Sequence, residues 1–353
     1  MMIADQILQG DCVEVLHSLP EKCVDVVFAY PPYNLQLQAE LYRPNLTKVD
    51  AVNDAWDQFE SLTVYDQFTH VWLAACRHVL KDTGTLWVIG SYHNIYRVGA
   101  VLMNLGYWVL NECVWEKSNP MPNFKGTRFT NAHETLIWAQ KQQGAPYTFN
   151  YHALKNGNED TQMRSVWQMP VCSGSERLYV DGEKAHTTQK PEALLHRVIT
   201  SSTHPGDLIL DPFFGTGTTG AVAKKLRRRW LGIEREERYV RVAQARIDAI
   251  TPASPDEAVY QPSNKPKLPR LPFVQLVECG LLQPGQRLRL AKTDYYATVM
   301  ADGALLYEHG HGSIHKVASH FYGAPANGWT SWLYYDGADW QPIDSLRQRL
   351  RDT

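Results

Sequence analysis

The first 250 residues alternate short runs rich in β-branched residues with longer amphipathic segments. This alternation is typical of βα units wound around a mostly parallel sheet. We therefore predict an α/β domain over residues 1–250. Strands are expected at residues 24–29, 85–89, 208–210 and 230–234, and helices at residues 63–80, 94–105, 191–202, 218–226 and 236–250.

Other stretches break this alternation. Residues 34–61 are polar and aperiodic, and a connection of that length is usually functional or mobile. Residues 144–186 are irregular, which predicts a substrate-contacting insertion. Six prolines between residues 251 and 272 predict a stiff linker. Beyond it, Asp302-Gly303 and Asp336-Gly337 predict hairpin turns in a small β-rich domain, residues 273–353, that ends in a helix at 345–351.

Composition is that of an ordinary globular protein, with 44% hydrophobic and 20% charged residues. No apolar stretch suits a signal peptide or a membrane span, so we expect a cytoplasmic protein without membrane contact. The formal charge of -2 neither proposes nor excludes a nucleic-acid partner. The six cysteines are scattered singly, and we expect no metal site and no disulfide.

A glycine-rich string, GTGTTG at residues 215–220, follows the predicted strand LILD and precedes a predicted helix. Such a turn lets the backbone approach a ligand closely, and the helix N-terminus offers unpaired N–H groups. Glu234 ends the next strand, where a carboxylate can accept hydrogen bonds from ribose hydroxyls. The pattern therefore suits a nucleotide-containing cofactor.

Two cofactors fit this loop, a nicotinamide dinucleotide and S-adenosylmethionine. The full string DPFFGTGTTG resembles the D-x-F-x-G-x-G loop that holds the methionine part of S-adenosylmethionine. An ammonium group needs an acceptor such as Asp211, whereas a pyrophosphate needs only N–H groups. The loop favours S-adenosylmethionine, with the candidate binding residues Asp211, Phe213, Gly215, Thr216, Gly217, Thr218 and Glu234.

A second string, AYPPYN at residues 29–34, directly follows the predicted strand VDVVFA. It resembles the D-P-P-Y motif of amino methyltransferases, which modify the exocyclic amine of adenine or cytosine. The lone pair of that amine is delocalised into the ring, so a carboxylate and the carbonyl of Pro31 must hold both amino hydrogens. Pro31 and Pro32 fix the backbone that aims the carbonyl. Tyr33 offers a face on which an extruded base can stack.

Taken alone, Pro-Pro-Tyr is a rigid turn or a polyproline ligand, but its place after a buried strand favours the methyltransferase interpretation. With PPY before the glycine loop, the motif order resembles the β class of these enzymes. Gly10-Asp11 resembles the pair that contacts the cofactor adenine, and Gln189-Lys190-Pro191 resembles the segment that closes the methionine end. The resemblance thus adds Asp11 and Lys190 to the candidate cofactor residues.

Longer strings, among them VDAVNDAWDQFES, KSNPMPNFKGTRFTNAHETLIWA and QKPEALLHRVI, resemble the cell-cycle-regulated adenine methyltransferases of α-proteobacteria. This resemblance implies a Rossmann-like, S-adenosylmethionine-dependent domain that methylates the adenine amine in GANTC. It also implies a homodimer on double-stranded DNA, a flipped target base and a C-terminal domain that helps to hold opened DNA. The amine chemistry by itself leaves cytosine-N4 methylation open.

Tyr30 stands where the motif has aspartate, and Thr187 stands where the family has proline. A phenol is neutral near pH 7, with an ordinary pKa of about 10, and its ring reaches beyond the end of a carboxylate. We therefore expect Tyr30 to occupy space intended for the base and to impair or abolish methyl transfer. A catalytically silent DNA-binding protein is the alternative function.

Candidate DNA contacts come from three regions. Asn34 follows PPY, and the segment KSNPMPNFKGTRF could line a DNA cleft or form a solvated loop. In the C-terminal domain, His315 and Lys316 are candidate phosphate contacts, and Trp329 is either a core residue or a stacking platform. The full candidate set is Asn34, Lys117, Ser118, Asn119, Lys125, Arg128, His315, Lys316 and Trp329.

Overall fold

The structure is a computed structural model that describes residues 3–35, 55–123, 126–252, 256–261 and 271–351. The chain divides into two compact units, residues 1–265 and 266–353. Most of the predicted functional loop at 34–61 lies outside the described residues, as does Lys125.

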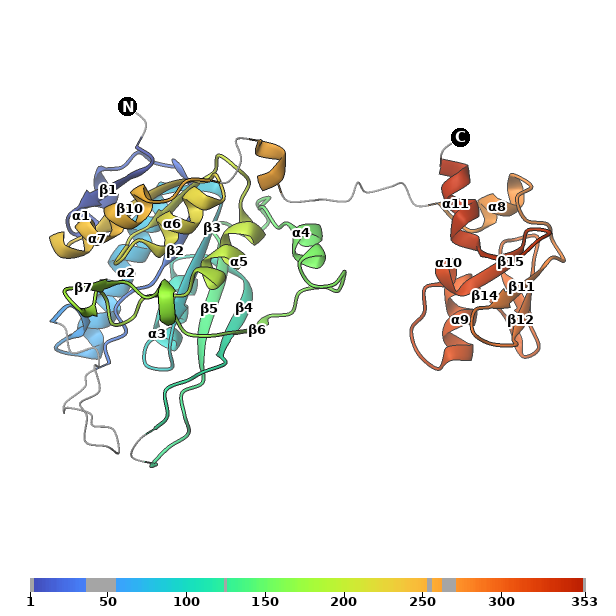
Figure 1. Cartoon of the computed structure of the whole chain (residues 1–353), viewed down its shortest axis with the longest axis horizontal. Coiled ribbons are helices and arrows are strands. Elements are labelled where there is room, and N and C mark those ends of the chain that lie inside the picture. Colours follow the sequence, from blue (N-terminus) through green and yellow to red (C-terminus); the bar gives the residue numbers. More distant parts are fainter. Residues whose placement is uncertain (1–2, 36–54, 124–125, 253–255, 262–270, 352–353) are drawn as a thin grey trace. The chain divides into compact units, whose positions relative to one another are not determined.

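The first unit is built on an eight-stranded mixed sheet (Figure 1). Its five parallel strands pair in the order β1, β10, β9, β2 and β3, and β5 then runs antiparallel to β3. In sheet order the strands are β1 (Gln6–Gln9), β10 (Arg229–Glu234), β9 (Leu208–Asp211), β2 (Val24–Ala29), β3 (Leu80–Gly90), β5 (His133–Gln140), β4 (Trp108–Lys117) and β6 (Val166–Met169).

Helices cover both faces of this sheet, because its central strands are apolar on both sides. Val27 and Ala29 of β2 pack into one hydrophobic cluster, while Val26 and Phe28 pack into another. The first cluster takes side chains from α1 (Cys12–Ser18), α2 (Leu62–Val79) and α3 (Ile95–Asn104). The second takes them from α5 (Glu192–Ser202), α6 (Thr218–Lys225) and α7 (Glu237–Asp248). This three-layer arrangement confirms the predicted Rossmann-like α/β class.

The predicted helices and parallel strands are confirmed to within a few residues, apart from β3, which begins five residues early. The antiparallel strands β4 and β5 were not predicted, and they join a sheet expected to be mostly parallel. The stretch 144–186 contains short elements: α4 (Tyr151–Asn156), β6, the 3₁₀ turn η2 (Gly174–Glu176), β7 (Tyr179–Val180) and β8 (Glu183–Lys184). Strand β6 pairs with β4, so part of this stretch belongs to the sheet edge.

The sheet order brings the two sequence motifs together. Strands β2 and β9 are parallel neighbours, with Val27 opposite Leu210, although they lie about 180 positions apart in the chain. The loops that leave their carboxyl ends therefore emerge at one edge of the sheet. Ligands of open α/β sheets bind at this edge.

The second unit is a six-stranded antiparallel sheet packed with short helices, which confirms the predicted β-rich C-terminal region. The turns at Asp302-Gly303 and Asp336-Gly337 connect hairpins, as predicted. Trp332 lies fully buried in its core. The elements are α8 (Val274–Glu278), β11 (Arg287–Leu290), β12 (Tyr296–Val299), β13 (Leu305–Tyr307), β14 (Gly310–Gly312), α9 (Ile314–Tyr322), α10 (Gly328–Ser331), β15 (Trp332–Tyr335), β16 (Trp340–Pro342) and α11 (Ile343–Arg351).

None of the helices within the described ranges is long and apolar enough to cross a membrane.

Candidate active site

The glycine loop between β9 and α6 depends on left-handed backbone. Gly215 and Gly217 have φ values of 53° and 71°, which residues with a Cβ rarely adopt. A Cβ on Gly217 would lie 2.8 Å from the Cβ of Ala243 in α7, so this glycine lets the loop pack against that helix. Gly217 is not among the residues that line the neighbouring cavity, so its clearest contact in the structure is with α7.

Two carboxylates organise this loop. Asp211 accepts hydrogen bonds from the Phe213 N–H at 2.9 Å and the Thr219 hydroxyl at 2.6 Å, and burial raises the pKa of Asp211 to about 7. Glu234 accepts bonds from the N–H groups of Gly215 at 2.7 Å and Glu236 at 2.9 Å. Burial also raises the pKa of Glu234. Both groups favour a positively charged or hydroxyl-rich ligand.

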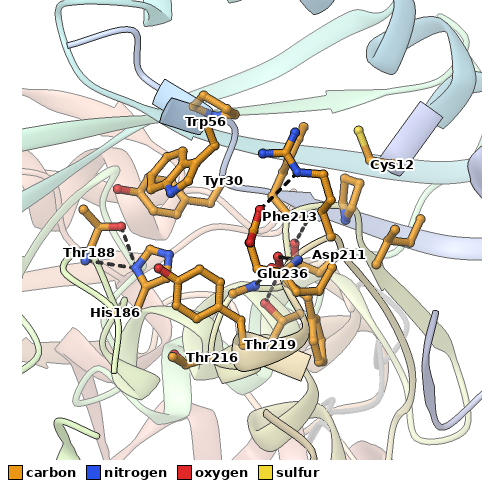
Figure 2. A pocket seen from close by; sticks show the side chains of 18 of the residues that line it. Cys12, Tyr30, Trp56, His186, Thr188, Asp211, Phe213, Thr216, Thr219 and Glu236 are labelled. Carbon is orange, nitrogen blue, oxygen red and sulfur yellow. Dashed lines mark hydrogen bonds and ion pairs between the residues drawn. The ribbon is translucent and has the colours of Figure 1, made fainter. Parts of the chain in front are cut away.

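A cavity of about 380 Å³ lies over the carboxyl ends of β1, β10, β9 and β2 (Figure 2). The ring of His186 packs between Trp56 and Tyr239 in its wall. Burial, helped by nearby Lys190, lowers the pKa of His186 to about 4, so the ring is neutral near pH 7. The predicted cofactor residues that line the cavity are Asp11, Lys190, Asp211, Phe213, Gly215, Thr216, Thr218 and Glu234.

A second cavity, of about 630 Å³, lies beside the first and is lined by Pro31, Tyr33, Trp115 and Glu134 among others. The two cavities share a wall, which is made of Tyr30, Trp56, Thr188, Gln189 and Lys190. A group bound in one cavity would thus face a group bound in the other across these five residues.

Tyr30 is the part of this shared wall that comes from the PPY loop. Its ring meets Tyr33 edge to face at 5.0 Å between centroids, and the ammonium of Lys190 lies 3.6 Å from the centroid of Tyr30. Burial raises the pKa of the Tyr30 phenol despite the nearby cation. At neutral pH the Tyr30 side chain is therefore an uncharged ring that contacts the aromatic ring of Tyr33 and the ammonium of Lys190.

Glu134, at the start of β5, is a site residue that sequence reasoning missed. Its carboxylate accepts a bond from the Tyr33 hydroxyl at 2.7 Å and pairs with Lys117 at 2.8 Å and Lys190 at 3.1 Å. Burial alone would raise the pKa of Glu134, but the two ammonium groups and the Tyr33 hydrogen bond lower it to about 2. The signal was a lone glutamate ahead of an apolar strand, in HETLIWA.

Lys190 was expected among the cofactor residues, and the structure places its ammonium beside both cavities. Its ammonium pairs with Glu134 and lies over Tyr30, so it borders both cavities. Burial by itself would lower the pKa of Lys190. Glu134 and Tyr30 together raise it by more, so the pKa lies above its ordinary value. Lys190 is thus a permanent cation in the shared wall.

The candidate DNA contacts near this site differ in their surroundings. Lys117 and Asn119 line the second cavity, and the Asn119 side chain also accepts a bond from the Val171 N–H at 2.8 Å. Ser118 is exposed, and exposed Arg128 lies 5.9 Å from the ring centroid of Tyr92. Asn34 is buried, and its N–H donates to Asp57 at 2.9 Å.

In the second unit, Trp329 is 7% exposed and packs against Phe273, with the guanidinium of Arg347 over its ring. This places Trp329 in the core rather than on a stacking platform. His315 accepts a bond from the Gly328 N–H at 3.0 Å and so joins α9 to α10, whereas the side chain of Lys316 is exposed. Among the residues that the structure describes, no cluster of three His, Cys, Asp or Glu side chains could hold a metal ion.

Comparison with known proteins agrees with this geometry. A model of the DNA methylase family matches residues 24–245, and a model described as Restriction Enzyme Adenine Methylase Associated matches residues 253–353. The chain is 44% identical to the type II methyltransferase M.HinfI of Haemophilus influenzae, over 97% of this chain and 95% of that protein. It is 38% identical to the type II methyltransferase M2.MboI of Moraxella bovis, over 71% of this chain and 90% of that protein.

Solved structures agree at the level of the fold. The complex of M1.HpyAVI with SAM matches with a TM-score of 0.51 and 26% identity, over 69% of this chain and 98% of that one. The cytosine-N4-specific PvuII DNA methyltransferase matches with a TM-score of 0.53 and 21% identity, over 72% of this chain and 89% of that one. The chain therefore belongs to the DNA methylase family.

Proposed function

We propose that this DNA methyltransferase acts on the exocyclic amine of adenine in double-stranded DNA, at the sequence GANTC. The single observation that carries the proposal is the wall shared by two cavities, one at the glycine loop and one at the PPY loop. A donor and an extruded base bound on its two sides would face each other. The family model over residues 253–353, which names adenine methylases, supports adenine over cytosine.

The methyl donor is S-adenosylmethionine, which when bound supplies a methyl group on a positively charged sulfur. The first cavity fits it, because Asp211 is a buried acceptor suited to an ammonium group and Glu234 suits ribose hydroxyls. The rings of Trp56, Phe68 and Phe213 give this donor an apolar face, and Asp11 adds a third carboxylate to the lining. A pyrophosphate, by contrast, would meet these carboxylates in the same cavity.

The second cavity supplies the groups that a flipped base needs. The Pro31 carbonyl accepts one amino hydrogen, and the ring of Tyr33 supports the base by stacking. The stretch 144–186 acts as a target-recognition region, because two of its residues, Val171 and Arg177, line the second cavity. The enzyme works as a homodimer in the cytoplasm, on the DNA of the nucleoid.

Tyr30 impairs this reaction in two ways. It removes the carboxylate that would hold the second amino hydrogen, and a lost polar contact of this kind costs roughly 100- to 1000-fold in rate. Its ring also stands in the shared wall, on the path between donor and amine. The cavity at the glycine loop keeps its carboxylates, so cofactor binding survives.

The test compares this chain with Tyr30→Asp in methyl transfer from labelled S-adenosylmethionine. The duplexes contain GANTC, a scrambled version of that sequence, or no site. We expect at least 100-fold faster transfer by Tyr30→Asp, on adenine and on GANTC alone. Equal rates for the two chains would refute this account of Tyr30. Label on cytosine would refute the adenine assignment.

A second function follows from the contact between Tyr30 and Lys190. Because the ammonium lies over the ring at 3.6 Å and also pairs with Glu134, the shared wall is closed by the protein's own groups. The unaltered chain would then be a silent DNA-binding protein that occupies methylation sites. Specific binding to GANTC duplexes without turnover, measured by fluorescence anisotropy, distinguishes it from a slow enzyme.

A further inference from the structure

A buried carboxylate outside both motifs holds the PPY loop. Asp57, in the 3₁₀ turn η1 (Ala55–Asp57), is only 3% exposed. One of its oxygens accepts bonds from the N–H groups of Tyr33 at 2.6 Å and Asn34 at 2.9 Å, and the other accepts the N–H of Leu35 at 2.9 Å. Three successive N–H groups that converge in this way form an anion-binding nest, and here the anion is a side chain of the protein itself.

The backbone conformation of the loop fits this arrangement. Asn34 has a φ of 55°, in the left-handed region, which turns its N–H to the same side as its neighbours'. A residue other than glycine in this region costs about 1–3 kcal/mol, and it persists only where other contacts hold it. The three bonds to Asp57 are such contacts, and without them the left-handed conformation of Asn34 is no longer stabilised.

A second contact fixes the same loop one residue earlier. The hydroxyl of Tyr65 in α2 donates to the Pro32 carbonyl at 2.9 Å and accepts from the amide of Asn94 at 3.1 Å. Burial raises the pKa of Tyr65 to about 12, so the hydroxyl keeps its proton at neutral pH. Asn94 also accepts from the Ser91 N–H at 3.0 Å, which ties the chain of bonds to the end of β3.

Among the described residues, these contacts leave the Pro31 carbonyl available. The Pro32 carbonyl and the next three N–H groups are all engaged, whereas no donor within the described part of the chain bonds to the Pro31 carbonyl. A catalytic acceptor needs this combination, because its own oxygen must be free while the atoms around it are fixed.

We propose that Asp57 is a positioning residue for the target base. Its carboxylate fills the nest and so aims the Pro31 carbonyl and the Tyr33 ring at the base. This inference rests on the proposed function of the second cavity. Asp57 acts through the loop and not on the base itself, because both of its oxygens are engaged by backbone N–H groups. Its removal shifts the acceptor, and a displacement of about 1 Å costs on the order of 100-fold in rate.

The experiment uses the full chain in the Tyr30→Asp background, with Asp57→Ala, Asp57→Asn and the control Asp66→Asn. Asp66 is a partly exposed carboxylate of α2 that pairs with Arg97. We expect Asp57→Ala to lower kcat, counted per cofactor-binding site, by about 100-fold, with KM for S-adenosylmethionine within about twofold. Asp57→Asn keeps one acceptor oxygen, so its kcat should fall less than that of Asp57→Ala. The kcat of Asp66→Asn should not change.

A second readout follows the base rather than the reaction. A duplex with 2-aminopurine at the target adenine becomes fluorescent when the base leaves the stack. We expect Asp57→Ala to reduce this signal at saturating DNA, whereas a purely structural role would lower the fraction of cofactor-binding protein and leave the signal per site unchanged.

The outcomes separate the two proposals. If Tyr30→Asp transfers methyl groups and Asp57→Ala keeps its kcat, the role of Asp57 is overturned and the proposed function stands. If Tyr30→Asp neither transfers methyl groups nor gives a 2-aminopurine signal, the proposed function fails. Hydrogen exchange at the amides of residues 33–35 then decides the anchoring: faster exchange there alone in Asp57→Ala supports it, and unchanged exchange overturns it.

Discussion

At the scale of single residues, the titration of Asp211 predicts how cofactor binding depends on pH. Burial raises the pKa of Asp211 to about 7, so below that pH the group is increasingly protonated and cannot pair with an ammonium. The dissociation constant for S-adenosylmethionine should therefore rise about tenfold for each pH unit between 7 and 5. His186 does not contribute, because its pKa of about 4 lies below this range.

Isothermal titration calorimetry in buffers of different ionisation enthalpy checks this prediction, since binding near pH 6 should release about one proton. Asp211→Asn is the control, and it should bind weakly with little dependence on pH. A flat profile for the unaltered chain would show that Asp211 does not meet the ammonium.

Glu134 predicts a large loss of stability on neutral substitution. Glu134→Gln leaves Lys117 and Lys190 buried together without their shared partner, and breaking a buried ion pair in this way costs about 3–5 kcal/mol. Urea unfolding measures the loss. Glu112→Gln on the neighbouring strand β4 is the matched control, because Glu112 is exposed and its change should cost less than about 0.5 kcal/mol.

The contribution of Glu134 to the free energy of unfolding depends on pH over a defined range. The pKa of Glu134 is lowered to about 2, against about 4.3 in an unfolded chain, so its contribution to stability is complete above about pH 4.3. That contribution is lost as the pH falls from there toward 2. The difference in the free energy of unfolding between the unaltered chain and Glu134→Gln should therefore become smaller as the pH falls toward 2. A difference that stays constant down to pH 2 would contradict the ion-pair account.

At the scale of elements, strand β10 packs closely against Phe214, which lies three residues after Asp211 in the glycine loop. A Cβ on Gly232 would come within 2.4–2.5 Å of ring atoms of Phe214, which stacks on Trp230 at 5.7 Å between centroids. Gly232→Ala should push this ring away and destabilise the chain by about 1–3 kcal/mol. Thermal unfolding followed by tryptophan fluorescence measures both effects.

The control for this strand is Gly157→Ala. A Cβ at Gly157 would meet its nearest atoms at 3.7 Å, and the backbone there has an ordinary negative φ. Its melting temperature should stay within about 2 °C of the unaltered chain, because nothing has to move. Equal losses in the two variants would contradict the packing argument for Gly232.

At the scale of the whole molecule, the two units predict separable functions. Lys316 is exposed on α9 of the second unit, while the cofactor cavity is lined by residues of the first. Lys316→Ala should weaken binding to any DNA and lower the slope of log K against log salt by about 1, because one phosphate contact is lost.

Anisotropy titrations at several salt concentrations measure this slope, and cofactor affinity should not change. Lys22→Ala is the control, since Lys22 is an exposed residue of the first unit that pairs with Asp82 at 2.8 Å. A slope that is unchanged in Lys316→Ala would exclude Lys316 from the DNA contacts.

Local patterns were enough to predict the class of the fold and the positions of its glycine-rich and proline-rich loops. The alternation of apolar runs and amphipathic segments reports burial, and burial determines which segments become strands and helices. The strings DPFFGTGTTG and AYPPYN carry their own backbone requirements, in left-handed glycines and paired prolines. For this reason both loops could be located from the residues, whereas the resemblance to the D-P-P-Y motif was needed to recognise Tyr30 as a departure.

Tertiary structure decided which side chains meet. Glu134 and Asp57 are unremarkable acids in the sequence, and only the pairing of β5 with β3 and the return of η1 to the PPY loop bring them to the site. Trp329 could have been a platform or a core residue, and packing against Phe273 and Arg347 decided it. Contacts between residues far apart in the chain depend on strand order and loop closure, which no local pattern encodes.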